Sequence, residues 1–247
     1  GVATSMGVET LQIPMFGLYG ACSTSGEALA LASMSVAAGY GERMLAVTSS
    51  HFGSAEKEFR FPLGYANQRP LSAHWTVTGS GAFIVGKNRS HVRITGVTVG
   101  KIVDYGLKDS QNMGACMAPA ACDTIIQNLE DFERKETDYD RIITGDLGYV
   151  GQSILFDLMR GKEHDIKINH MDCGMTIFDQ NLQDTHAGGS GCGCAAATLS
   201  AYILPKISRG EWKRVLFVPT GALMSTVSYN EGASVPGIAH GIVLEHC

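Results

Sequence analysis

A cysteine in a sharp turn offers the most clearly defined chemistry in this sequence. Cys22 follows the apolar run 13–18, which has β-strand character, and precedes a helical pattern that starts by Thr24. A strand–turn–helix elbow of this kind lifts one side chain out of the backbone, and the positive N-terminus of the helix points at it. We therefore expect a lowered thiol pKa at Cys22, in a position to bind a carboxylate or a developing oxyanion. The alternative is a small buried core residue, as free cysteines often are.

Several further polar and cysteine positions are weaker candidates. Asp146 ends a strand pattern, where α/β proteins often place ligand-binding groups, but aspartate is also common in turns. His240 precedes the last strand pattern and His51 follows an earlier one, and each could line a pocket or simply bond to backbone. Cys192 and Cys194 stand among small residues, which favours close helix packing over metal binding.

The composition indicates an α/β protein and excludes several classes of function. The chain has 247 residues, of which 45% are hydrophobic, and its 30 glycines suit many tight strand–helix turns. The net charge is −5 and no cluster of Lys and Arg stands out, so nucleic acid is not expected as a partner. No apolar run is long enough to span a membrane, and no signal segment opens the sequence. The seven cysteines lack the spacing of a zinc site or a disulfide scaffold, which favours a reducing compartment.

The elements that must position Cys22 alternate between helix and strand. The segment 51–75 is polar and too long for a simple turn, and such loops often carry function or a partner surface. The segment 169–174 is polar and turn-like, and the glycine-rich string 188–194 opens a helix of small residues. The patterns predict helices over 25–38, 118–134, 153–159 and 195–207, and strands over 13–18, 43–48, 79–85, 92–99, 139–144, 214–218 and 241–245.

The two halves of the chain repeat each other. One constant shift places Gly20 on Gly191, Cys22 on Gly193, Gly39 on Gly210, Arg43 on Arg214, Leu45 on Leu216 and Val47 on Val218. The strand 81–85 then matches 241–245. We therefore expect halves over 1–100 and 101–247 about a pseudo-twofold axis, with the helices 25–38 and 195–207 adjacent and antiparallel. The strand and helix over 139–159 have no counterpart before Gly1, so we expect the sequence to lack an N-terminal segment.

A duplicated α/β unit with a cysteine elbow resembles the thiolase superfamily, which includes the condensing enzymes of fatty-acid synthesis. The resemblance implies a thiolase-like fold of duplicated α-β-α-β-α layers and, by default, a homodimer. It also implies that Cys22 takes the place of the acyl nucleophile, that His170 matches the first assisting histidine, and that Ser190 replaces the catalytic asparagine. A serine has a shorter reach and only one donor, which speaks against catalysis. An acyltransferase that uses Cys22 and His170 nevertheless remains the alternative function.

A more specific resemblance is to the stage V sporulation protein AD family. It covers nearly the whole chain in order, through FGLYGACSTS at 16–25, AVTSSH at 46–51, TVTGSGA at 76–82, DSQNMG at 109–114, MAPAA at 117–121, LED at 129–131, TGDL at 144–147, MDCG at 171–174, AGGSGC at 187–192 and IAHG at 238–241. The resemblance implies binding of dipicolinic acid or its calcium chelate, and support for its uptake into the forespore. It further implies association with the forespore inner membrane and with membrane proteins of the same sporulation operon, without cofactors.

The resemblance defines one ligand site. It would contain Cys22, His170, Asp172, Cys173, Ser190 and His240, and no bound metal of the protein's own. Cys22 would lie beside one ligand carboxylate as a neutral thiol, and His170 would supply a donor or a positive charge. Asp172 would orient His170 or contact the calcium of the chelate; alternatively it only caps the turn before Gly174. A purely structural role, in which the surface binds partner proteins, is the remaining alternative.

Overall fold

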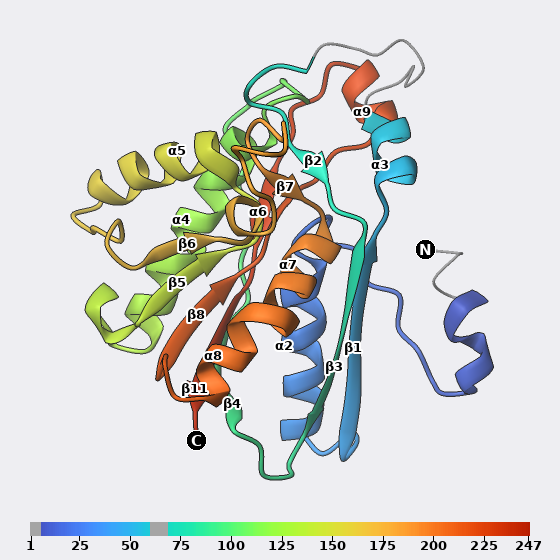
Figure 1. The fold of residues 1–247 in the computed structure, drawn as a ribbon, viewed down its shortest axis with the longest axis vertical. Helices are drawn as coiled ribbons and strands as arrows, with labels where there is room; N and C mark the ends of the chain where they lie inside the picture. The colour runs from blue at the N-terminus through green and yellow to red at the C-terminus, as the bar shows by residue number, and fades with distance from the viewer. Residues whose placement is uncertain (1–5, 60–68) are drawn as a thin grey trace.

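Two β-sheets enclose a layer of helices, and further helices cover the outer face of the larger sheet (Figure 1). The computed structural model describes residues 6–59 and 69–247. The helices are α2 (Thr24–Ala37), α3 (Phe52–Phe59), α4 (Met113–Asp131), α5 (Gly148–Arg160), α6 (Cys173–Thr176), α7 (Cys192–Thr198), α8 (Leu204–Ser208) and α9 (Thr226–Asn230). The strands are β1 (Arg43–Ser50), β2 (Trp75–Thr76), β3 (Gly79–Gly86), β4 (Val92–Thr98), β5 (Arg141–Thr144), β6 (His170–Asp172), β7 (Gly189–Ser190), β8 (Arg214–Val218), β9 (Thr220–Ala222), β10 (Gly237–Ala239) and β11 (Gly241–His246). The α/β class is therefore confirmed.

The larger sheet has the strand order β4-β11-β8-β5-β6. Strands β6, β5 and β8 are parallel, and β11 runs antiparallel to both of its neighbours, β8 and β4. Strand β4 lies before residue 101, so this sheet includes one strand from the predicted first half of the chain. The helices α4 and α5 pack on one face of the sheet, and α2, α7 and α8 lie on the other (Figure 1). The carboxyl ends of β5 and β6 therefore lie near the N-terminus of α7, where ligand groups gather in α/β proteins.

The internal repeat is visible as two similar helix–strand–strand units. In the first unit α2 leads into β1, which pairs antiparallel with β3; in the second, α7 and α8 lead into β8, which pairs antiparallel with β11. Both turns between helix and strand need a glycine, because Gly39 and Gly210 have φ angles of +83° and +72°. Arg43 pairs with Gly86 in the first unit, and Arg214 pairs with Glu245 in the second. The strand pairing therefore aligns β3 with β11 one residue away from the alignment that the sequence repeat predicts.

The two central helices pack against each other, as expected, but their relative direction differs from the prediction. Both α2 and α7 begin near the middle of the molecule in Figure 1 and run downward, so they are not antiparallel. The sulfur of Cys22, just before α2, lies 3.7 Å from the hydroxyl of Ser190, just before α7. The helical run continues from α7 through a π-helical turn over Leu199–Ile203 into α8. The repeat therefore brings two helix N-termini together at one place.

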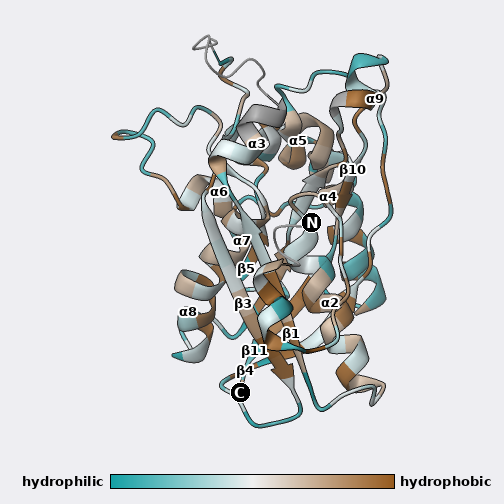
Figure 2. Cartoon of the chain, turned by 90° about the vertical axis from the view of Figure 1, so that its right-hand side faces the viewer, coloured by the Kyte–Doolittle hydropathy of each residue, from teal (hydrophilic) through white to brown (hydrophobic). Residues whose placement is uncertain are grey.

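The segment before the elbow is not a strand. Residues 12–19 have no assigned secondary structure, and Phe16 is 93% exposed. An extended segment becomes a strand only when a neighbour supplies ladder hydrogen bonds, and no described strand pairs with this one. Most residues of strand β1 are exposed or half-buried, because among the described strands it pairs with β3 alone. Figure 2 looks onto this side and shows hydrophobic residues along β1.

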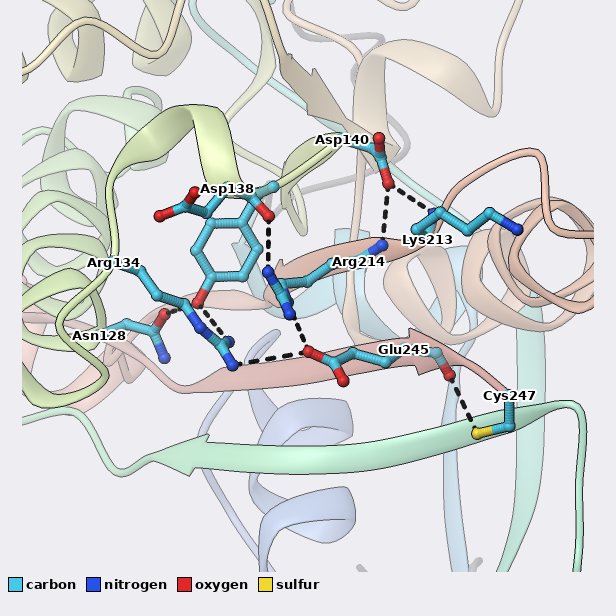
Figure 3. A network of polar contacts seen from close by, with 9 residues as sticks. Asn128, Arg134, Asp138, Asp140, Lys213, Arg214, Glu245 and Cys247 are labelled. Carbon is cyan, nitrogen blue, oxygen red and sulfur yellow. Dashed lines mark hydrogen bonds and ion pairs between the residues drawn. The ribbon is translucent and has the colours of Figure 1, made fainter.

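The far end of the large sheet is held by a polar network (Figure 3). Arg134 donates to the Tyr139 hydroxyl at 3.2 Å and lies 3.6 Å from a Glu245 oxygen. Arg214 also donates to Glu245, and the backbone N–H of Arg214 donates to Asp140 at 2.9 Å. These bonds join the start of β5 and β8 to the end of β11. They hold the three strands in place at this end of the sheet.

Within the described residues, no helix combines the length and apolar character needed to cross a bilayer.

Candidate functional site

The sequence-predicted pair Cys22 and Ser190 lies together, and a third residue completes the contact. The Cys22 sulfur is 3.7 Å from the Ser190 hydroxyl, which donates to Oδ2 of Asp146 at 2.8 Å. Cys22 is partly exposed, whereas Ser190 and Asp146 are buried. A serine hydroxyl has one proton, and here it is given to the carboxylate. The thiol is therefore the donor in its contact with Ser190.

The backbone around these side chains requires glycine at two places. Gly191 has a φ of +107°, and a Cβ there would lie 2.6 Å from the Ser50 hydroxyl. Gly221 lies against the elbow, where a Cβ would be 2.3 Å from the Gly20 carbonyl oxygen and 3.3 Å from the Cys22 nitrogen. Both contacts would be closer than real Cβ atoms allow, so a side chain at either position would separate the segments that form the site.

Asp146 is held by three donors from two segments, 190–191 and β9. Its Oδ2 accepts from the Gly191 N–H at 2.9 Å as well as from Ser190, and its Oδ1 accepts from the Thr220 hydroxyl at 2.9 Å. Asp146 is 1% exposed. The carboxylate therefore ties the loop after β5 to the start of α7 and to β9.

The thiol pKa moves in the direction opposite to the prediction. Burial raises the pKa of the Cys22 thiol well above 9.0, and the neighbouring Asp146 carboxylate and Cys192 raise it further. The elbow was expected to stabilise a thiolate, but the carboxylate disfavours a second negative charge beside it. At neutral pH Cys22 is therefore a protonated thiol.

The first N–H groups of the elbow are already used. Ser23 N donates to the Gly20 carbonyl at 3.0 Å, and Thr24 N donates to the Ala21 carbonyl at 3.3 Å. The hydroxyls of Ser23 and Thr24 bond to the same two carbonyls. These donors close the turn itself, so they do not form the open anion cradle that the sequence suggests.

Asp172 is a helix cap with four protein donors. One oxygen accepts from the Thr144 hydroxyl at 2.6 Å and from Leu147 N at 2.9 Å, and the other accepts from Gly148 N at 3.2 Å and Met175 N at 3.1 Å. Burial raises its pKa to about 6, while the donors act in the opposite direction, so it is ionised at neutral pH. The segment predicted as a turn is the strand β6 followed by α6, and Asp172 is the N-cap between them. This is the geometry of the capping alternative.

His170 is bonded on both ring nitrogens. Thr144 gives its hydroxyl proton to Asp172, so Nε2 of His170 is the donor in its 3.0 Å contact with Thr144. Nδ1 accepts from Gln152 at 3.0 Å, and the ring meets Phe156 edge-on at 5.2 Å. Burial lowers the pKa of His170 from 6.5 to about 3. His170 is therefore neutral and supplies no positive charge.

We expect His170 to make unfolding sensitive to acid. The folded-state pKa of about 3 lies below the ordinary 6.5. Between these two pH values the unfolded chain therefore binds a proton at His170 that the folded chain does not bind. Its contribution to stability is complete above pH 6.5 and falls by about 1.4 kcal/mol for each pH unit below that, down to the folded pKa. Urea unfolding from pH 7 to pH 5 should therefore be less steeply pH-dependent in His170→Gln. An unchanged slope would show that this ring is not buried in the neutral form.

The remaining predicted site residues lie close to these networks. Cys173 is fully buried in the core under α2 and α7. His240 is 6% exposed and accepts from Gly100 N at 3.3 Å, and its carbonyl oxygen lies close to Gly26 in the first turn of α2. Burial lowers the pKa of His240. Cys192 donates to the Ser49 carbonyl at 3.1 Å. Among the described residues, no group of three or more His, Cys, Asp or Glu side chains could hold a metal ion.

Asp146 is the functional candidate that the sequence underrates. Its motif, Thr144 to Gly148, is visible in the sequence as the end of a strand with two glycines, and four of its five residues bond to Asp172 or Ser190. Thr144, Leu147 and Gly148 bind Asp172, while Asp146 binds Ser190. Gly148 has a φ of +64°, and a Cβ there would be 2.2 Å from the Ala187 carbonyl oxygen. The loop thus joins the two networks.

Comparison with known sequences gives one family. The sequence profile described as stage V sporulation protein AD matches residues 1–245. The stage V sporulation protein AD of Bacillus subtilis (strain 168) is 44% identical over 235 residues, which cover 95% of this chain and 69% of that protein.

Solved structures support the same fold. AbyA1, a tetronic acid condensing enzyme, has a TM-score of 0.60 at 15% identity, with 95% of this chain and 69% of that one covered. The 3-oxoacyl-[acyl-carrier-protein] synthase III of Aquifex aeolicus VF5 has a TM-score of 0.59 at 13% identity, with 99% and 71% covered. The Acat5 thiolase of Ascaris suum has a TM-score of 0.54 at 9% identity, with 92% and 78% covered. The fold is thiolase-like, and the chain belongs to the stage V sporulation protein AD family.

Proposed function

We propose that this sporulation protein binds dipicolinic acid as its calcium chelate, at the site around Cys22, and supports its uptake into the forespore. The observation that carries the proposal is the contact of Cys22 with Ser190, which donates to the buried Asp146; burial and this carboxylate raise the pKa of the Cys22 thiol. A binding protein needs stable polar groups, whereas acyl transfer needs a thiolate. The state of this cysteine therefore favours binding over the acyltransferase alternative.

The charge of the site favours the chelate over the free dianion. Asp146 is a buried carboxylate next to Cys22, and a second carboxylate, Glu27, lies in the first turn of α2. A bare dicarboxylate would be repelled by these groups in a poorly screened environment. A calcium chelate carries its own compensating charge, and calcium prefers oxygen ligands of the kind that dipicolinate supplies.

Calorimetric titration of the chain would test the proposal. Calcium dipicolinate should give a saturable heat, and dipicolinate with a calcium-stripping chelator should bind more weakly. Calcium with benzene-1,3-dicarboxylate is the matched control, since it has the same two carboxylates but lacks the ring nitrogen that completes the chelate. We expect that control to bind no better than calcium alone.

Two outcomes would count against the proposal. If neither form of dipicolinate binds saturably, the site is not a dipicolinate site and a purely structural role is favoured. If mass spectrometry after incubation with an acyl-coenzyme A finds an acyl group on Cys22, the acyltransferase alternative is favoured.

A further inference from the structure

Asp146 ends a hydrogen-bond chain with a fixed direction. The Cys22 thiol donates to the Ser190 hydroxyl over 3.7 Å, and that hydroxyl donates to Asp146 over 2.8 Å. The carboxylate has no donor of its own to return along the chain. Because the Ser190 proton is donated to Asp146, the Cys22 thiol is the donor in its contact with Ser190, and Asp146 itself is a second acceptor for the thiol proton.

The carboxylate is fixed in this position. The Gly191 N–H at 2.9 Å and the Thr220 hydroxyl at 2.9 Å occupy two of the three lone-pair positions that Ser190 leaves. These donors come from the start of α7 and from β9, and Asp146 itself is 1% exposed. Rotation away from Ser190 would leave buried donors without a partner, which costs more than the bonds themselves contribute.

The charged and titratable neighbours of Cys22 make a thiolate unfavourable. Asp146 faces it from the loop after β5, Cys192 faces it from α7, and Cys194 lies on the core side. Glu27 on α2 lies beside Gly20, at the other end of the elbow. Of these groups Asp146 is the carboxylate that acts on Cys22, and it opposes a negative charge on the sulfur. An aspartate is also a much weaker base than a thiolate, so the chain does not take the proton from sulfur.

We propose that Asp146 is the positioning residue of this site: it orients Ser190 to accept from Cys22 and keeps the sulfur protonated, so that Cys22 acts as a binding group and not as a nucleophile. The role in binding rests on the proposed function. The state of the sulfur is a property of the free protein and is tested without ligand.

The test is the pH profile of alkylation at Cys22 in the parent and in Asp146→Asn. A thiolate sulfur displaces iodide from iodoacetamide, whereas a thiol does not, so the labelling rate reports the thiolate fraction. Labelling from about pH 6 to about pH 10 would be followed for each cysteine by mass spectrometry of peptides. In Asp146→Asn the Cys22 profile should move to lower pH, and a shift of about one unit gives roughly tenfold faster labelling near neutrality.

Other cysteines serve as internal controls. Cys173 and Cys194 are fully buried and should stay unlabelled in every folded variant. The exposed Cys247 should be labelled in every variant, which shows that the reagent is active. Ser190→Ala interrupts the chain but keeps the Asp146 charge, so its Cys22 should remain slow. The role would be overturned if Asp146→Asn, with Cys173 and Cys194 still protected, labels at the parental rate.

The parent alone can also overturn the proposal. Its Cys22 should label with a midpoint above the usual thiol range of about 8.5. If it labels at or below that range, the sulfur is not held protonated, whatever the folding of the variants. Equal acceleration by Ser190→Ala and Asp146→Asn would instead assign the effect to the hydrogen bond at Cys22 and not to Asp146. Either result leaves the calorimetric test of dipicolinate binding unaffected.

Discussion

Cys22→Leu is expected to abolish binding of calcium dipicolinate. The cysteine side chain already makes a close contact with Ser190, at 3.7 Å, and the Gly221 backbone lies against the same turn. A leucine adds bulk that neither neighbour can accommodate, since one of them is backbone and the other is held by Asp146. The added side chain would therefore fill the space at the elbow where a ligand has to approach the sulfur.

Smaller substitutions separate binding from catalysis at the same atom. Cys22→Ser should bind roughly tenfold more weakly or less, because a neutral hydrogen bond contributes about 0.5–1.5 kcal/mol. Cys22→Ala should lose somewhat more. Calorimetric titration of the three variants beside the parent should therefore give a graded loss from Ser to Ala to Leu. Measurable acyl transfer by the parent that disappears in Cys22→Ser would contradict the binding function.

Asp172→Ala is expected to destabilise the fold strongly. The change leaves four buried or half-buried donors unsatisfied, from Thr144, Leu147, Gly148 and Met175. Each such donor costs about 1–3 kcal/mol, partly relieved by water, so a total loss of roughly 3–5 kcal/mol is expected. That is a large part of the ~5–15 kcal/mol that typically stabilises a domain. Urea unfolding followed by circular dichroism would measure it.

A second helix cap provides the matched control. Asn112 caps α4 through one bond, from Ala115 N at 3.3 Å. Asn112→Ala should therefore cost only about 1 kcal/mol, as ordinary cap losses do. If Asp172→Ala costs no more than this control, Asp172 is not the centre of the loop network, and a ligand-binding role for its carboxylate becomes the better account.

The repeat and most elements could be predicted because they depend on local pattern. Glycines that end helices, apolar strands and small-residue helices are visible in the sequence, and the constant spacing between Gly39 and Gly210 revealed the duplication. The strand 13–18 was not predictable in the same way, because a strand exists only with a partner. The relative direction of α2 and α7 is also a tertiary property, which spacing does not fix.

The site shows the same division between local and tertiary information. The pairing of Cys22 with Ser190 followed from the resemblance to a duplicated cysteine-elbow family. The direction of the thiol pKa shift could not be predicted in this way. The elbow alone favours a thiolate and a lowered pKa, whereas burial and Asp146 raise the pKa. Asp146 itself looked like ordinary turn chemistry, since the donors that define its role come from Ser190 and Thr220, far along the chain.

The common starting point of α2 and α7 creates an electrostatic problem that Asp146 relieves. Two helices that run side by side in the same direction repel each other, since each N-terminus carries about half a positive charge and the two ends meet here. A single buried carboxylate at this junction offsets the repulsion, and Asp146 supplies it through the Gly191 N–H. The duplication of the fold therefore generates a need for one negative charge at its centre, and the chain meets that need with its own residue before any ligand arrives.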